Sequence, residues 1–64
     1  MAEKHSKPAD KLLTIEDVAE LCRVSTRTVR RWIDDGALTA AKLGAQWRIR
    51  QRDLDHFILD RLER

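Results

Sequence analysis

Hydrophobic residues recur at helical spacing after Thr14. They fall at positions i, i+3, i+4 and i+7, the stripe of a short amphipathic helix, and are Ile15, Val18, Ala19 and Cys22. Thr14 can cap the N-terminus of this helix, and Asp17 occupies the partner position of a capping box. The pattern predicts a helix from Thr14 to about Cys22.

A second amphipathic segment follows after about three residues. Ser25 offers an N-cap, Thr26 to Asp35 fits a helix, and Gly36 stands at the C′ position that ends it. The expected buried face consists of Val29, Trp32 and Ile33. Two short helices joined by such a turn are typical of a helix-turn-helix.

The hydrophobic period changes to two between Leu38 and Arg50. Apolar residues alternate with polar ones on either side of Gly44-Ala45: Ala41, Leu43, Trp47 and Ile49 against Lys42, Gln46, Arg48 and Arg50. A Gly-X pair between alternating segments predicts a hairpin with a type II′ turn. We expect the apolar set to face the body of the protein and the polar set to face outward.

A last helix is predicted from about Gln51. Its expected packing side consists of Leu54, Phe57, Ile58 and Leu62, whereas Leu59 falls off this stripe. The fold class predicted is mainly α with a small β-hairpin: a winged helix-turn-helix of about three helices and a two-stranded wing, over residues 12–64. Residues 1–11 are charged and aperiodic, so we expect a disordered arm there.

The composition excludes several classes of protein. A chain of 64 residues has room for one domain. It contains one cysteine, so no intramolecular disulfide can form, and no histidine or acid cluster has metal-ligand spacing. No apolar run could cross a bilayer, and we expect no signal peptide, because Met1 to Lys11 is polar and charged and has no apolar stretch. No nucleophile–base pair or phosphate-binding glycine loop is present. We therefore expect no enzyme activity, cofactor, metal or membrane contact.

Charge is distributed unevenly along the chain. Residues 1–22 carry three lysines and five acids, residues 23–52 carry eight basic residues and two acids, and residues 53–64 carry two arginines and four acids. A basic middle between acidic flanks predicts one positive face directed at a polyanion. The alternative is an ordinary solvated surface, since 38% of the residues are charged.

The outer side of the second predicted helix holds the candidate base-reading residues. Arg27 and Arg30 can each bond the O6 and N7 atoms of guanine in the major groove. Phosphate contact is expected from Thr26, Thr28 and Arg31. The alternative is that these arginines only solubilise an amphipathic helix.

The hairpin supplies a second candidate element. Lys42, Arg48 and Arg50 are expected to form one basic edge that follows the backbone or enters a minor groove. The alternative is that these charges only discourage edge-to-edge strand pairing. Further candidates for phosphate contact are Ser25, Gln46 and Arg52. Both tryptophans are expected in the core.

The segments Leu13 to Leu21 and Val24 to Ile33 together resemble the helix-turn-helix of the excisionase family, which is related to MerR-like winged-helix regulators. Lys42-Leu43-Gly44 and Trp47-Arg48-Ile49 resemble its wing, and Arg52-Asp53-Leu54 resembles the start of its closing helix. Two positions depart from the family pattern. Cys22-Arg23 stands where a glycine is frequent, and Ala45 follows Gly44 where arginine is common.

The resemblance implies a recombination directionality factor. Such a protein binds tandem sites on double-stranded DNA cooperatively, head to tail with copies of itself. It bends the DNA and helps a site-specific integrase excise a mobile element in the bacterial cytoplasm or nucleoid. One alternative is a small MerR-like transcription regulator without an effector domain, with the same DNA chemistry but no integrase partner. Another, from a different class, is a protein-interaction module.

Overall fold

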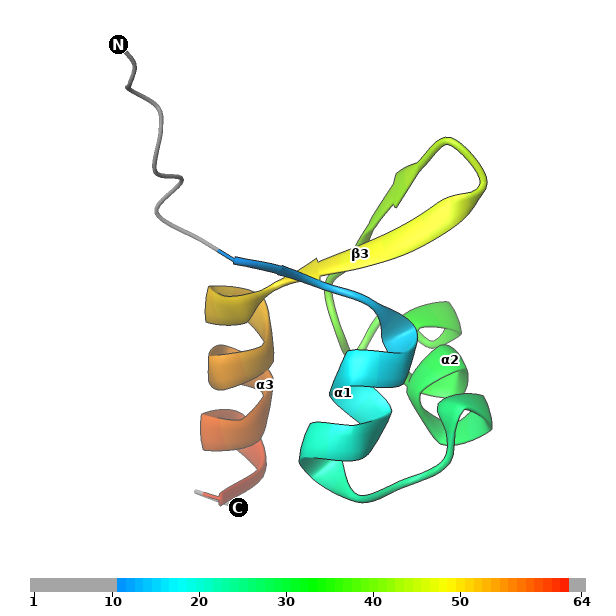
Figure 1. Cartoon of the computed structure of the whole chain (residues 1–64). Coiled ribbons are helices and arrows are strands. Elements are labelled where there is room, and N and C mark those ends of the chain that lie inside the picture. The colour runs from blue at the N-terminus through cyan, green and yellow to red at the C-terminus, as the bar shows by residue number, and fades with distance from the viewer. Residues whose placement is uncertain (1–10, 63–64) are drawn as a thin grey trace, which may run out of the picture.

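The computed structural model describes residues 11–62. Its elements run in the order β1 (Leu12–Leu13), α1 (Ile15–Cys22), α2 (Thr26–Asp34), β2 (Ala41–Leu43), β3 (Gln46–Arg50) and α3 (Gln51–Leu62). The helices lie below a small sheet, and the β2–β3 hairpin projects beyond them on the side of α2 (Figure 1). The predicted winged helix-turn-helix is confirmed. The expected disordered arm falls outside the described residues, except for Lys11.

Helix α1 begins with the predicted capping box. The Thr14 hydroxyl accepts a hydrogen bond from the Asp17 N–H at 2.9 Å, and the Asp17 carboxylate accepts one from the Thr14 N–H at 3.0 Å. The helix ends at Arg23, whose φ of 59° is left-handed. This conformation costs a residue with a Cβ about 1–2 kcal/mol. The turn thus forms without the glycine that is frequent in the family.

Helix α2 is also defined by local contacts. The Ser25 hydroxyl accepts from the Thr28 N–H at 3.1 Å and caps the helix. At the other end Gly36 has a φ of 80°, and its N–H donates to the Ile33 carbonyl at 3.0 Å. The Ala37 N–H donates to the Trp32 carbonyl, which completes a Schellman motif. The predicted helix and its glycine stop are confirmed to within one residue.

The sheet of the described region has three strands in the order β1-β3-β2, with both pairs antiparallel. Sequence reasoning predicted only the two strands of the wing. It missed β1 because two residues are too short to show alternation. The pairing of Leu13 with Ile49 and the hydrogen bond from the Gln51 N–H to the Lys11 carbonyl at 2.9 Å fasten this strand to the end of β3.

The wing has the predicted two-residue turn, but the predicted sidedness of its first strand is wrong. Gly44 has a φ of 66° while Ala45 does not have a positive φ, as a type II′ turn requires. A two-residue turn pairs odd-numbered with even-numbered positions, so Lys42 lies opposite Trp47 and Leu43 opposite Gln46. Paired residues share a face of the sheet. Leu43 therefore lies on the outer face and is 53% exposed.

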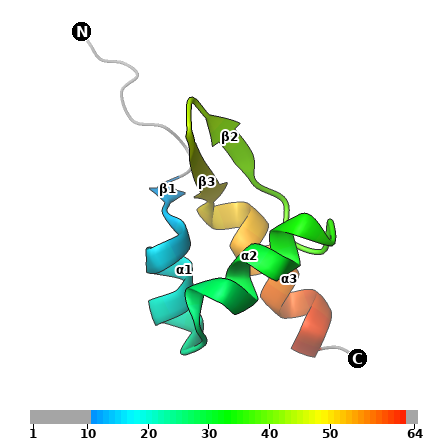
Figure 2. The same ribbon diagram turned by 90° about the vertical axis from the view of Figure 1, so that its right-hand side faces the viewer.

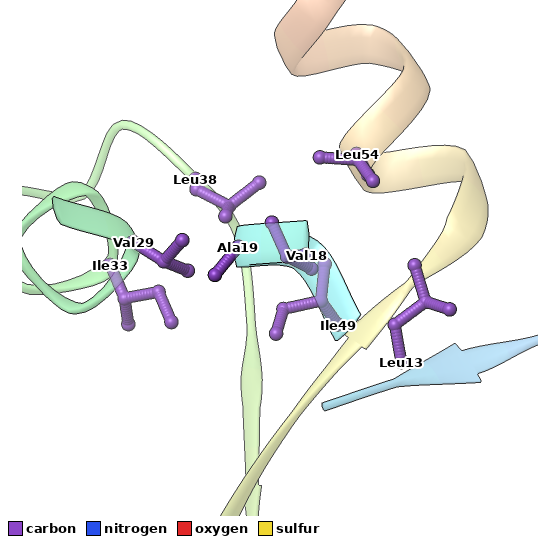
Figure 3. Close-up of a cluster of buried hydrophobic side chains, with 8 residues drawn as sticks. All are labelled: Leu13, Val18, Ala19, Val29, Ile33, Leu38, Ile49 and Leu54. Carbon is purple, nitrogen blue, oxygen red and sulfur yellow. The ribbon is translucent and has the colours of Figure 1, made fainter. Parts of the chain in front are cut away.

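The core lies between the sheet and the helices. Figure 3 shows the buried side chains that converge there from every element except β2: Leu13, Val18, Ala19, Val29, Ile33, Leu38, Ile49 and Leu54. Trp32 and Trp47 pack against this cluster, as predicted. The ring centroids of Trp32 and Phe57 lie 4.7 Å apart.

The expected packing stripe of α3 is only half correct. Leu54 is buried and Phe57 partly buried, but Ile58 is exposed and Leu62 is 74% exposed. Leu54 in the first turns is the buried residue of α3, and residues 58–62 at its end are exposed. Figure 1 shows this helix beside α1. Leu59 is exposed, as its position off the stripe predicts.

Replacing Thr14 by alanine should destabilise the domain by about 1 kcal/mol, because the cap of α1 loses its acceptor. Urea unfolding of the two proteins measures this difference. Thr39→Ala serves as the control, since Thr39 is an exposed threonine outside the helices. Equal losses in both variants would contradict the role of the capping box.

The capping box should also make stability depend on pH. The hydrogen bond from the Thr14 N–H lowers the pKa of the Asp17 carboxyl below its ordinary value of 3.8, and the Thr14 hydroxyl lowers it further. Its contribution is therefore fully present above pH 3.8 and is lost as the pH falls through the lower, folded-state pKa. The stability advantage of the wild type over Asp17→Asn in urea should shrink over that interval. An advantage that stays constant would contradict the assignment.

Candidate nucleic-acid interface

The exposed side of α2 carries the predicted base-reading residues. Arg27, Arg30 and Arg31 are exposed, while Val29 and Ile33 on the other side are buried in the core. Trp32 packs against Phe57, so α3 lies behind α2 and leaves this side open. In Figure 2, α2 crosses the front of the molecule below the wing. The arrangement allows the helix to approach a major groove without obstruction.

The polar residues at the start of α2 divide into two kinds. Thr26 is exposed on the first turn. The hydroxyls of Ser25 and Thr28, two predicted phosphate contacts, lie 3.0 Å apart and are hydrogen-bonded to each other. Ser25 also holds the N-cap, so its hydroxyl already serves the helix terminus.

Arg48 is held by two hydrogen bonds within the wing. Its Nη1 donates to the Trp47 carbonyl at 3.0 Å, and its Nη2 donates to the Gln46 side-chain oxygen at 2.7 Å. Lys42 lies on the opposite face of the hairpin, with its Nζ 5.6 Å from the centroid of the Trp47 ring. The prediction that Lys42 joins Arg48 and Arg50 in one basic edge is therefore wrong.

Arg50 lies at the junction of β3 and α3, where it binds Asp53. Its Nε donates to one carboxylate oxygen at 2.8 Å and its Nη2 to the other at 3.3 Å. The Asp53 side chain is only 14% exposed, so this pair fixes the start of α3 to the strand. Arg52 lies on the first turn of the same helix and is exposed.

A groove brings α2, the wing and the start of α1 together. Arg30 lines it from α2, Gln46 and Arg48 line it from the wing, and Thr14 and Glu16 line it from α1. Two arginines distant in the sequence thus border the same open space. Sequence reasoning missed the contribution of α1, because Thr14 and Glu16 are far in sequence from the wing residues that border the groove with them.

Among residues 11–62 no group of three or more His, Cys, Asp or Glu side chains could hold a metal ion. Burial raises the pKa of the Cys22 thiol, which suits a small residue packed against the core. No helix in this range is long and apolar enough to span a membrane.

Arg48 and Arg50 should respond differently to substitution. Arg48→Ala should weaken binding to all DNA sequences alike and reduce the salt slope by about 1, while leaving stability nearly unchanged. Arg50→Ala should lower the free energy of unfolding by about 1 kcal/mol, because Asp53 loses its partner. Salt-dependent DNA titrations and urea unfolding measure the two effects. The same profile in both variants would contradict the distinction.

Comparison with known protein families gives a match over most of the chain. The family model for a helix-turn-helix domain covers residues 12–61, which is most of the chain. None of the curated proteins and none of the solved structures compared with the chain matches it. The chain belongs to the helix-turn-helix domain family, and this membership indicates sequence-specific DNA binding.

Proposed function

We propose that the protein is an excisionase-type architectural DNA-binding protein. In this role it binds tandem sites cooperatively, bends the DNA and promotes excision of a mobile element by an integrase, without itself catalysing a reaction. The observation that carries the proposal is the groove that Arg30 of α2 and Arg48 of the wing share. One duplex can contact both elements at once. The role in excision is inferred from the resemblance of the sequence to the excisionase family.

Each element has a defined task in this proposal. Helix α2 enters the major groove, where Arg27 and Arg30 reach guanine edges and Thr26 and Arg31 contact phosphates. The wing follows the adjacent backbone through Arg48. Contact by both elements favours DNA that bends toward the protein, because the added contacts offset the energy of deformation.

Cooperativity is expected because one protomer is small. It offers few phosphate contacts, so its binding alone is modest and strongly salt-dependent. The end of α3 exposes Ile58, Leu59 and Leu62, and the exposed Asp55 lies one turn before Ile58 and Leu59 on the same side of the helix. This acidic and apolar surface suits the basic wing of a neighbour in a head-to-tail array. Such a contact does not close on itself and can propagate along the DNA.

A mobility-shift titration tests the proposal. The DNA comes from the region that flanks the gene, random DNA is present in excess, and two salt concentrations are compared. A ladder of shifted species that resists competitor is the expected result, followed by integrase-dependent excision in a recombination assay. Single-site binding without cooperativity would contradict the array. Promoter occupancy without any effect on recombination would favour transcription regulation, and no shift at low salt would favour a protein partner.

Arg27→Ala and Arg30→Ala should each cost about 1–3 kcal/mol of binding free energy and relax specificity at one position of the site. Affinities for a set of single-base variants of the site measure both effects. Lys11→Ala is the control, because it removes the same charge from an exposed residue that lies outside α2, the wing and α3. Losses that are uniform across all base variants would contradict base reading by these arginines.

A further inference from the structure

The DNA-facing side of α2 includes an acid that the proposed function does not explain. Arg27, Arg30, Arg31 and Asp34 follow one another at i, i+3, i+4 and i+7, so they share one side of the helix. The Oδ1 atom of Asp34 lies 3.5 Å from the Nε atom of Arg30. The side chains of Arg30 and Asp34 are 55% and 59% exposed. A carboxylate thus lies where phosphates of a bound duplex approach.

Fold stability does not account for Asp34. It occupies the last turn of α2, where the negative end of the helix dipole disfavours a carboxylate. An exposed i, i+4 ion pair contributes less than about 1 kcal/mol, and the order with the arginine first is the weaker one. Within residues 11–62 no other hydrogen bond or ion pair engages the Asp34 side chain.

The geometry of the pair suits base recognition. A guanidinium can present either its Nε–Nη side or its two Nη atoms to a partner. Asp34 occupies Nε, and within the described residues nothing engages the Nη atoms of Arg30. Those two atoms form the pair of donors that fits the O6 and N7 acceptors of guanine. The ion pair at Nε therefore leaves both Nη atoms of Arg30 without a protein partner among the described residues, so they are open to a base.

We propose that Asp34 is a positioning residue that holds Arg30 for bidentate contact with guanine and so determines specificity at that base pair. The inference rests on the proposed DNA binding by α2. Arg30 borders the groove that it shares with Arg48, so an Arg30 side chain without this restraint can turn toward a phosphate there. A phosphate contact would add affinity but no sequence information. The Asp34 carboxylate also repels phosphates, which lowers affinity for random DNA.

The test compares Asp34→Ala with Asp35→Ala. Asp35 is the next residue, is also exposed, and its loss removes the same charge. Both variants should therefore bind random DNA a few-fold more tightly at low salt. At the base pair where Arg30→Ala relaxes specificity, only Asp34→Ala should also reduce the preference for guanine, by a factor on the order of ten. Asp34→Asn keeps an acceptor for Nε and should retain part of the preference.

A double-mutant cycle shows whether Asp34 acts through Arg30. In the Arg30→Ala background, Asp34→Ala should change base discrimination no further. Thermal unfolding should be the same for Asp34→Ala, Asp35→Ala and the wild type, which separates positioning from a structural effect. Affinities for single-base variants of the site provide the readout for the wild type and all five variants.

Each outcome has a distinct meaning. Specific DNA binding with an unchanged guanine preference in Asp34→Ala would overturn the inference and leave the proposed function intact. A loss of discrimination at another base pair would also overturn it, because Asp34 would then read a base itself. A wild-type protein that binds no DNA would overturn the proposed function, and the inference with it.

Discussion

The central strand β3 is the element on which the rest of this small structure depends. It pairs with β1 on one side and β2 on the other, and its Ile49 side chain is completely buried. Its first residues pair with β2 to form the wing, and its last residue leads directly into α3. The same five residues therefore fix the direction of the wing and the start of the last helix. Ile49 shares one buried cluster with Val18 of α1 and Leu54 of α3, which aligns the wing and the last helix with the helix-turn-helix (Figure 3).

Features encoded by neighbouring residues could be predicted, whereas those that depend on distant residues could not. The caps at Thr14 and Ser25 and the stop at Gly36 involve residues within a few positions, so the sequence indicates them directly. The strand β1 pairs with residues far along the chain and has no local pattern of its own. The exposed end of α3 looked like a packing surface because periodicity does not show where the partner elements end.

The sidedness of the wing is an intermediate case. The two-residue turn at Gly44-Ala45 was recognised, and it already requires that Leu43 share a face with Gln46 rather than with Trp47. The correct face of Leu43 therefore follows from the turn length. The alternation of polar and apolar residues, taken alone, assigns it to the wrong face. The site follows the same rule. The exposed arginines of α2 were predictable from amphipathicity, but the engagement of Arg50 by Asp53 depends on the bend where β3 meets α3.

Affinity and specificity place opposite demands on a DNA-binding surface of this size. Every added arginine strengthens binding to all sequences, and the surplus of random sites in a genome then competes with the true site. An acid on the reading helix weakens both kinds of binding, yet it weakens specific binding less if it also orients the arginine that reads a base. Cooperative neighbours can restore occupancy at tandem sites without strengthening binding to single random ones. Under the proposed function, Asp34 on α2 therefore favours the true site by base discrimination, and the exposed end of α3 favours it by cooperative binding.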